Sequence, residues 1–161
     1  MRIAVKFLFF VTSVVLAGCL NIGTDADTDT DTANEAITAT DTVATVQYQI
    51  KNLSSSTLTL DTASCSPSTS IFPPFSISSG STVSFSATTT ASSFLLCTVR
   101  YQDQTGVQGC QFQIDQAPSN SGFASTNAYK GSGSHTPTCR DLFDGANGPT
   151  AWSGNFTMQT N

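Results

Sequence analysis

Residues 94–115 read FLLCTVRYQDQTGVQGCQFQID and contain the clearest structural signal in the chain. Apolar and polar side chains alternate on both sides of Asp103–Gly106, a polar segment whose composition favours a turn. This period of two is typical of β-strands with one buried face. The stretch therefore predicts a β-hairpin with these inward residues: Leu95, Cys97, Val99 and Tyr101 on the first strand, and Cys110, Phe112 and Ile114 on the second.

The alternation continues towards the N-terminus of this hairpin. Residues 52–56 favour a turn between two alternating segments, which predicts a second hairpin over residues 43–60 with inward Val46, Tyr48, Ile50, Leu58 and Leu60. Pro73-Pro74 cannot donate to a ladder and excludes a central strand there. Short strands are expected at residues 75–77 and 83–85.

The C-terminal part is more polar. Residues 117–150 are rich in Ser, Gly, Asn and Pro, and predict a long loop with a short strand near Phe123 and a helical turn at Arg140–Phe143. A last strand follows, with one face formed by Trp152, Gly154, Phe156 and Met158.

No stretch shows sustained helical periodicity. Seven or eight short, one-sided strands in residues 43–161 predict an all-β fold, an antiparallel β-sandwich of two sheets packed face to face. A closed β-barrel is the alternative. This length supports one modest core, so we expect a single domain.

The N-terminus has the layout of a secretory signal peptide over residues 1–18. Arg2 and Lys6 precede an apolar run at residues 7–17, which is too short for a bilayer core that needs roughly 20 residues. The run ends in Leu16-Ala17-Gly18-Cys19, which resembles the lipobox of bacterial lipoprotein precursors. The resemblance implies cleavage before Cys19, a diacylglyceryl group on its thiol, and acylation of the new amine by a fatty acid such as palmitate.

Residues 19–42 predict a disordered, acidic linker. They hold six of the eleven carboxylates and no aromatic side chain, so they cannot bury enough apolar surface to fold. Residues 43–161 keep five acids and four bases, and are therefore almost neutral. Because no basic patch is present, we expect no nucleic-acid partner.

Four cysteines remain besides Cys19, and an even number in an exported chain predicts two disulfides. A two-residue hairpin loop, Gln104-Thr105, would place Cys97 opposite Phe112 and leave Cys97 and Cys110 diagonal, roughly 7–8 Å apart. That separation is long for a disulfide. A bulge at Gly109 would change this separation, so a Cys97–Cys110 bridge stays open as an alternative. The favoured prediction is that each hairpin cysteine pairs with a loop cysteine, either Cys65 or Cys139, and the spacing does not choose between them.

Candidate catalytic and metal-binding residues are few. His135 is the only histidine, and with Asp141 and Asp144 it could form a Ser-His-Asp arrangement or a metal site. No Gly-x-Ser-x-Gly elbow accompanies it, and a solvated loop histidine is the simpler interpretation. We expect no enzymatic activity, no metal and no cofactor.

Phe72-Pro73-Pro74-Phe75 places two phenylalanines beside a rigid double proline. The favoured interpretation is an apolar plug between the sheets. The other interpretation is an exposed apolar loop, Phe72 and Phe75, that contacts a partner or a membrane.

Three groups of residues occur in an order that distantly resembles small β-sandwich cytolysins of the aegerolysin type. They are Tyr48-x-Ile50-x-Asn52, then Pro73-Pro74 with Ile77 and Gly80, and then Gly106-Val107-Gln108-Gly109-Cys110 with Phe112. This resemblance implies a membrane-active, lipid-binding protein. The lipobox instead implies an envelope lipoprotein with a binding or structural role. In this family, lipoproteins that stay in the inner membrane of a Gram-negative cell commonly carry Asp directly after the lipidated cysteine. Leu20 occupies that position here, which implies the outer membrane.

We predict that the mature protein starts at an acylated Cys19. Mass spectrometry of the native protein should find an N-terminal peptide that carries fatty acyl chains and lacks residues 1–18. A Cys19→Ser chain is the control, because it keeps the apolar run but offers no thiol for acylation. A free Cys19 thiol, or a mature start elsewhere, would contradict the prediction.

Overall fold

The computed structural model describes residues 43–118, 121–148 and 150–161. Within these residues, nine strands and one short 3-10 turn, Gly133–His135, form the fold. The strands are β1 (Ala44–Asn52), β2 (Leu58–Ser66), β3 (Ser76–Ile77), β4 (Thr82–Thr89), β5 (Leu95–Asp103), β6 (Gly109–Ala117), β7 (Ser121–Lys130), β8 (Thr138–Ala146) and β9 (Ala151–Gln159). The predicted signal peptide, Cys19 and the linker all lie outside the described residues.

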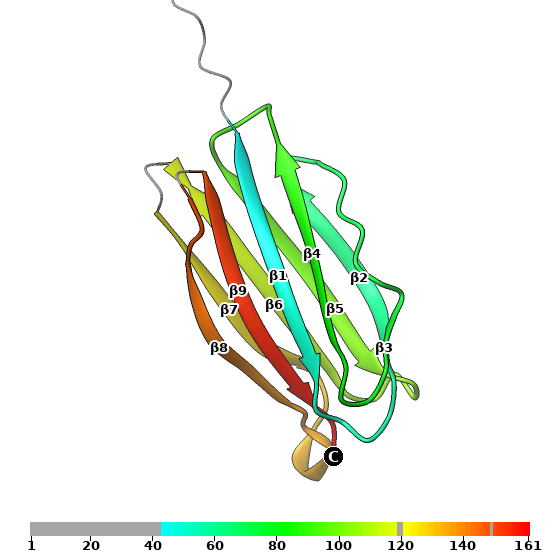
Figure 1. The fold of residues 1–161 in the computed structure, drawn as a ribbon. Helices are drawn as coiled ribbons and strands as arrows, with labels where there is room; N and C mark the ends of the chain where they lie inside the picture. Colours follow the sequence, from blue (N-terminus) through cyan, green and yellow to red (C-terminus); the bar gives the residue numbers. More distant parts are fainter. Residues whose placement is uncertain (1–42, 119–120, 149) are drawn as a thin grey trace, which may run out of the picture. The chain divides into compact units, whose positions relative to one another are not determined.

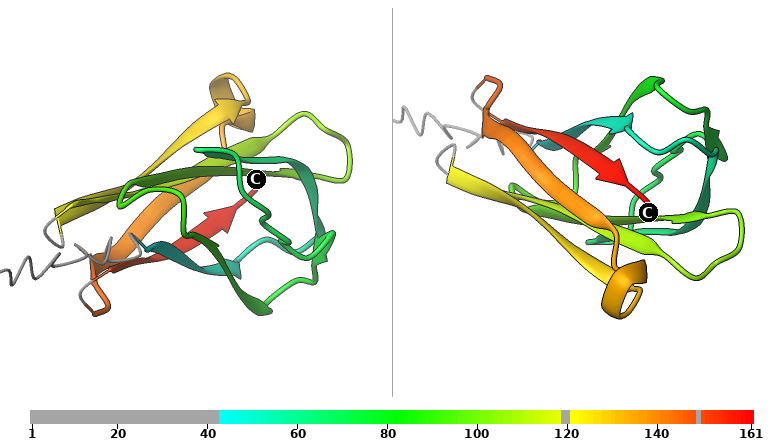
Figure 2. Two further views of the ribbon diagram at one scale, coloured as in Figure 1. Left: turned by 90° about the horizontal axis from the view of Figure 1, so that it is seen from above. Right: turned by 90° about the horizontal axis from the view of Figure 1, so that it is seen from below.

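The strands form two sheets that pack face to face (Figures 1 and 2). Sheet A has the order β4-β1-β9-β8, and sheet B has the order β3-β2-β5-β6-β7. The predicted all-β sandwich is confirmed, with two separate layers rather than one closed barrel. The first and last strands, β1 and β9, lie side by side at the centre of sheet A and run parallel, whereas the other neighbours pair antiparallel.

The hairpin predicted from residues 94–115 is confirmed as β5 and β6, but its loop is longer than predicted. Cys97 lies opposite Ile114, and Cys110 lies opposite Tyr101. The Asp103 carboxylate fixes this loop, because it accepts hydrogen bonds from the backbone N–H groups of Val107 (2.9 Å) and Gln108 (3.2 Å). Partial burial would raise the pKa of Asp103. The hydrogen bond from the Thr105 hydroxyl (2.7 Å), together with those from the loop N–H groups, outweighs burial and holds the pKa below its usual value.

The hairpin predicted over residues 43–60 is wrong, because β1 belongs to sheet A and β2 to sheet B. Asn52 directs the crossover between the sheets. Its buried side-chain amide donates to the carbonyl groups of Ser56 (2.8 Å) and Ile77 (2.9 Å), and its Oδ1 accepts from the N–H of Ser54 (2.8 Å). These bonds hold the segment as a bridge between layers, which the alternation of β1 and β2 does not reveal.

The long loop predicted for residues 117–150 is also wrong. The short strand predicted near Phe123 is confirmed, as part of the longer edge strand β7. The same residues also contain a second edge strand, β8, and the helical turn lies at Gly133–His135 rather than at Arg140–Phe143. Both strands are largely exposed, so they need few apolar side chains and show weak alternation. A bulge between Asp141 and Phe143 interrupts the pattern of β8 further.

The core lies between the inward faces of the two sheets. Its large buried side chains are Tyr48, Ile50, Leu58, Leu95, Val99, Tyr101, Phe112, Ile114, Phe156 and Met158. At its centre the Tyr48 hydroxyl crosses from sheet A to sheet B. It donates to the carbonyl of Cys97 (2.5 Å) and accepts from the N–H of Ile114 (3.2 Å). Burial raises the pKa of Tyr48 far above its usual range, although the Ile114 hydrogen bond acts in the opposite direction, so the phenol stays neutral and can donate.

We predict that Tyr48→Phe lowers the free energy of unfolding by about 1–3 kcal/mol, because it removes the partner of two buried backbone groups. Urea unfolding of the oxidised protein measures the loss. Tyr129→Phe is the matched control, since the Tyr129 hydroxyl bonds Asp61 at the surface (2.9 Å). This control should lose about 1 kcal/mol or less. Equal losses for the two variants would show that the buried bridge has no special role.

Candidate functional site

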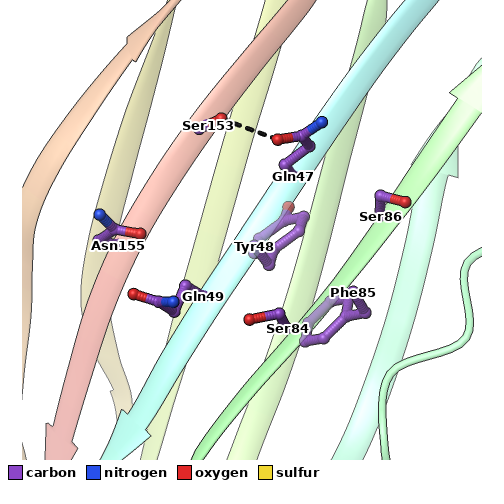
Figure 3. A pocket seen from close by; sticks show the side chains of 8 residues that line it. All are labelled: Gln47, Tyr48, Gln49, Ser84, Phe85, Ser86, Ser153 and Asn155. Atoms are coloured by element: carbon purple, nitrogen blue, oxygen red, sulfur yellow. Dashed lines mark hydrogen bonds between the residues drawn. The ribbon is translucent and has the colours of Figure 1, made fainter. Parts of the chain in front are cut away.

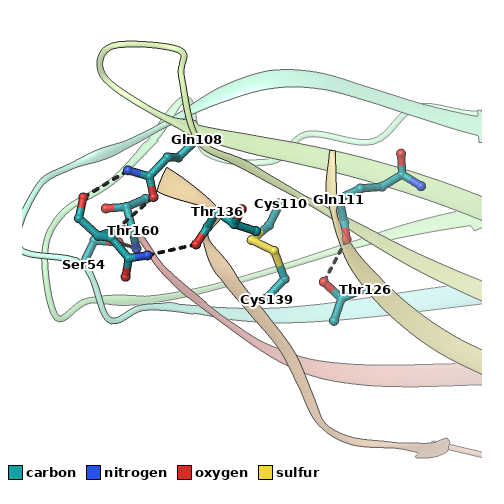
Figure 4. Close-up of a disulfide and its surroundings, with 9 residues drawn as sticks. Ser54, Gln108, Cys110, Gln111, Thr126, Thr136, Cys139 and Thr160 are labelled. Atoms are coloured by element: carbon teal, nitrogen blue, oxygen red, sulfur yellow. Dashed lines mark hydrogen bonds between the residues drawn. A yellow bond between two sulfur atoms is a disulfide. The ribbon is translucent and has the colours of Figure 1, made fainter. Parts of the chain in front are cut away.

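Two disulfides join the four cysteines of the described residues. Cys65–Cys97 links neighbouring strands β2 and β5 within sheet B, with the Cα atoms 4.1 Å apart. Cys110–Cys139 links β6 of sheet B to β8 of sheet A, with the Cα atoms 5.8 Å apart (Figure 4). Each hairpin cysteine thus pairs outside the hairpin. Cys65 and Cys139, however, lie in strands and not in the loops where they were expected.

The second disulfide lies near the C-terminus of the chain, which is also held in place (Figure 4). The Gln108 side chain exchanges two hydrogen bonds with the backbone of Asn161, each 3.0 Å long. The Ser54 hydroxyl accepts from the N–H of Thr160 (2.8 Å). The end of β9 is therefore fixed to both the β5–β6 loop and the crossover after β1.

The apolar loop of Phe72 and Phe75 is exposed, so the interpretation as a plug between the sheets is wrong. Phe72 is 81% exposed and Phe75 is 77% exposed. Two hydrogen bonds hold the loop backbone in place. The Tyr101 hydroxyl donates to the carbonyl of Pro74 (2.6 Å), and the N–H of Leu60 donates to the carbonyl of Phe75 (2.8 Å). Two phenyl rings are thus presented to solvent on a fixed backbone.

The outer face of sheet A has a polar depression of about 380 Å³, which we call the amide groove (Figure 3). Its outward side chains are Gln47, Gln49, Ser84, Ser86, Ser153 and Asn155, and Tyr48 and Phe85 also line it. The register arranges the polar residues in two rows across β4, β1 and β9: Ser86, Gln47 and Ser153, and then Ser84, Gln49 and Asn155. In the first row, Gln47 Oε1 accepts from the Ser153 hydroxyl (3.2 Å).

A second depression of about 330 Å³ lies on the same sheet, over β1, β9 and β8, and we call it the cationic depression. Its lining residues are Lys51, Leu53, Thr138, Arg140, Leu142, Thr157 and Gln159. Thr157 lies opposite Lys51 on one side and opposite Arg140 on the other. No carboxylate lines either depression. The sequence alone reveals neither depression, because the side chains of the amide groove meet only through the register of β4, β1 and β9, and those of the cationic depression only through the register of β1, β9 and β8.

The structure does not bring His135 together with Asp141 and Asp144. His135 is exposed in the 3-10 turn, and no hydrogen bond or ion pair joins it to either carboxylate among the described residues. Asp144 instead accepts from the N–H of Ala124 (3.0 Å) and from Nε1 of Trp152 (3.1 Å). Burial, followed by the charge of Asp144, raises the pKa of Asp141.

Within the described ranges, no group of three or more His, Cys, Asp or Glu side chains could hold a metal ion. The described part of the chain also has no helix that is long and apolar enough to cross a membrane.

The topology and the two-layer core define the fold as a β-sandwich. The solved structure of RahU, determined in complex with a TRIS molecule, is similar, with a TM-score of 0.54 over 73% of this chain and 96% of that chain. RahU is an aegerolysin-like protein, so the resemblance of this chain to the aegerolysin type extends to the fold. The two sequences are only 8% identical, and the likeness shows the fold alone. No protein-family model and no curated protein sequence matches the chain.

Proposed function

We propose that this chain is a lipid-anchored lipoprotein of a bacterial cell envelope, with the β-sandwich as its binding module. The observation that carries the proposal is a domain with two disulfides placed downstream of the LAGC motif at residues 16–19. Disulfides form and persist in oxidising compartments such as the periplasm. Several acyl chains on Cys19 would hold the protein far more firmly than the marginal hold of a single chain.

In this proposal, the linker sets how far the domain can move from the membrane. Residues 21–42, treated as a flexible coil, span on the order of 25 Å. The six carboxylates of this linker repel one another and disfavour contact with anionic head groups. The domain would therefore sample a volume above the membrane, where it can meet a soluble or envelope-bound partner.

We expect the anchor to be in the outer membrane of a Gram-negative cell, because Leu20 and not Asp follows Cys19. Density-gradient separation of membranes should recover the protein with outer-membrane markers. A Cys19→Ser chain is the control and should no longer be recovered with outer-membrane markers, since it lacks the acylated thiol. Recovery of the acylated protein with inner-membrane markers would overturn the location.

A second function, direct membrane activity, is favoured by one observation: the braced and exposed phenyl rings of Phe72 and Phe75. Exposed aromatic side chains on a rigid loop can enter the interface of a bilayer without an ordering cost in the loop. In this case the loop would contact lipid in addition to the anchor.

We predict that membrane activity depends on this loop. The test is cosedimentation of the Cys19→Ser chain, without its signal peptide, with phosphatidylethanolamine–phosphatidylglycerol vesicles. Replacing Phe72 and Phe75 by Ser should reduce the bound fraction at least fivefold. Phe143→Ser is the matched control, because Phe143 is exposed at the β8 edge. No sedimentation of the parent chain, or equal binding by the double variant, would reject this function and would leave the anchor proposal intact.

A further inference from the structure

The four basic side chains of residues 43–161 differ in whether another side chain pairs with them. On sheet B, Arg100 Nε donates to Gln111 (2.8 Å), and the Lys130 ammonium lies 3.8 Å from the Asp61 carboxylate. On sheet A, Lys51 and Arg140 form no ion pair or side-chain hydrogen bond with any residue that the structure describes. Sheet A therefore presents two cations whose charges are not neutralised by the fold.

These two cations share one row of the sheet. Neighbouring strands lie about 4.8 Å apart, so the Cα atoms of Lys51 and Arg140 are roughly 10 Å apart, with Thr157 between them. Both side chains are long enough to converge on one small anion above Thr157. A guanidinium and an ammonium together match the charge and geometry of phosphate or carboxylate oxygens.

Thr157 adds a hydroxyl at the centre of this row. The residue is only 5% exposed, yet it lines the cationic depression. Its hydroxyl makes no hydrogen bond with other described residues. The Thr157 hydroxyl is not among the buried polar atoms of the described residues that lack a partner, so it reaches solvent in the depression. It is therefore free to donate to an external oxyanion.

The nearby carboxylates do not oppose an anion here. Asp141 follows Arg140 in the chain but pairs with Phe156, a residue of the inward face. Asp144 is occupied by Trp152 and by the backbone of Ala124. With no carboxylate lining the depression, the local field at this row is positive although the domain as a whole is almost neutral.

The amide groove continues this row along the strands. The row of Gln49 and Asn155 is two residues away from the row of Lys51 and Thr157, a distance of about 7 Å along a strand. Figure 3 shows the Gln49 and Asn155 amides on neighbouring strands, turned to the same side of the sheet. Neither makes a side-chain hydrogen bond with the described residues. Amides offer both donors and acceptors, which is what the hydroxyl groups of a sugar require.

We infer that the outer face of sheet A binds an anionic saccharide, a hydroxyl-rich ligand that carries a phosphate or a carboxylate. Lys51, Thr157 and Arg140 hold the oxyanion. Gln49 and Asn155 hydrogen-bond to the sugar hydroxyls one row away. This inference rests on the proposed function and deepens it, because it gives the binding module a class of ligand.

The test uses the full acylated chain in mild detergent and follows its binding to three probes by isothermal titration calorimetry. Glucose 6-phosphate carries both groups, inorganic phosphate carries only the oxyanion, and glucose carries only the hydroxyls. We expect glucose 6-phosphate to bind at least tenfold more tightly than either of the other two probes. No detectable binding of glucose 6-phosphate at 10 mM, roughly the upper limit for a weak specific site, would overturn the inference.

Two matched pairs of variants separate the site from the net charge. Lys51→Gln and Arg140→Gln should each lower the affinity for glucose 6-phosphate at least fivefold. Lys130→Gln and Arg100→Gln make the same charge changes on sheet B and should leave the affinity unchanged. Equal weakening by all four variants would overturn the inference, because it would reflect long-range charge alone.

The Asn155→Ala variant tests the saccharide part. It should lower the affinity for glucose 6-phosphate at least threefold and leave the affinity for inorganic phosphate unchanged. If glucose 6-phosphate and phosphate bind equally, and Asn155→Ala has no effect, the face is an oxyanion site only and the saccharide assignment is wrong. This titration reads binding and not location, so its failure would leave the acylation of Cys19 and the membrane fractionation untouched.

Discussion

The buried hydroxyl of Tyr48 fixes how the two layers of the sandwich lie on one another. A phenol buried without a partner is costly, and here it is satisfied only where sheet A lies directly over the Cys97–Ile114 pair of sheet B. The hydrogen bonds therefore fix the position of one layer on the other, which apolar contacts alone specify poorly. Cys97 is also bonded to Cys65, so the polar bridge and a disulfide constrain the same point of β5.

The two open sides of the sandwich are closed by different means. On the side of β7 and β8, the Cys110–Cys139 disulfide joins the layers covalently, and the Asp144 carboxylate connects the Ala124 backbone of β7 to Trp152 of β9. On the side of β3 and β4, the chain itself closes the gap, with an isolated bridge between Ile71 and Ala87. The apolar loop follows that bridge directly. Its phenyl rings can remain exposed because the loop backbone, and not its side chains, holds the edge.

Alternation of apolar and polar residues predicts a strand where one of its faces is buried. It does not predict which of the two sheets the strand joins. The inward sets of β5, β6 and β9 could be predicted because alternation reflects burial. Assigning β1 and β2 to different sheets depends on the hydrogen bonds of Asn52, which no periodicity encodes. For the edge strands, the sequence predicts only a short piece of β7 near Phe123 and nothing of β8, because exposed strands need little apolar alternation. The cationic depression on sheet A is not evident from the sequence, because Lys51 and Arg140 meet only across Thr157.

The residues that specify the fold are buried, which leaves the outer face of sheet A available for binding. Cys97 and Cys110 are buried, as are Tyr48 and the apolar sets of both sheets, so the fold is specified from the inside. Outward residues of β1 and β9 contribute little to that specification and are free to carry other chemistry. Because β1 and β9 are central, their outward side chains form continuous rows with no exposed strand edge between them. A ligand on this face would therefore meet a rigid surface, and ordering loops would not reduce its affinity.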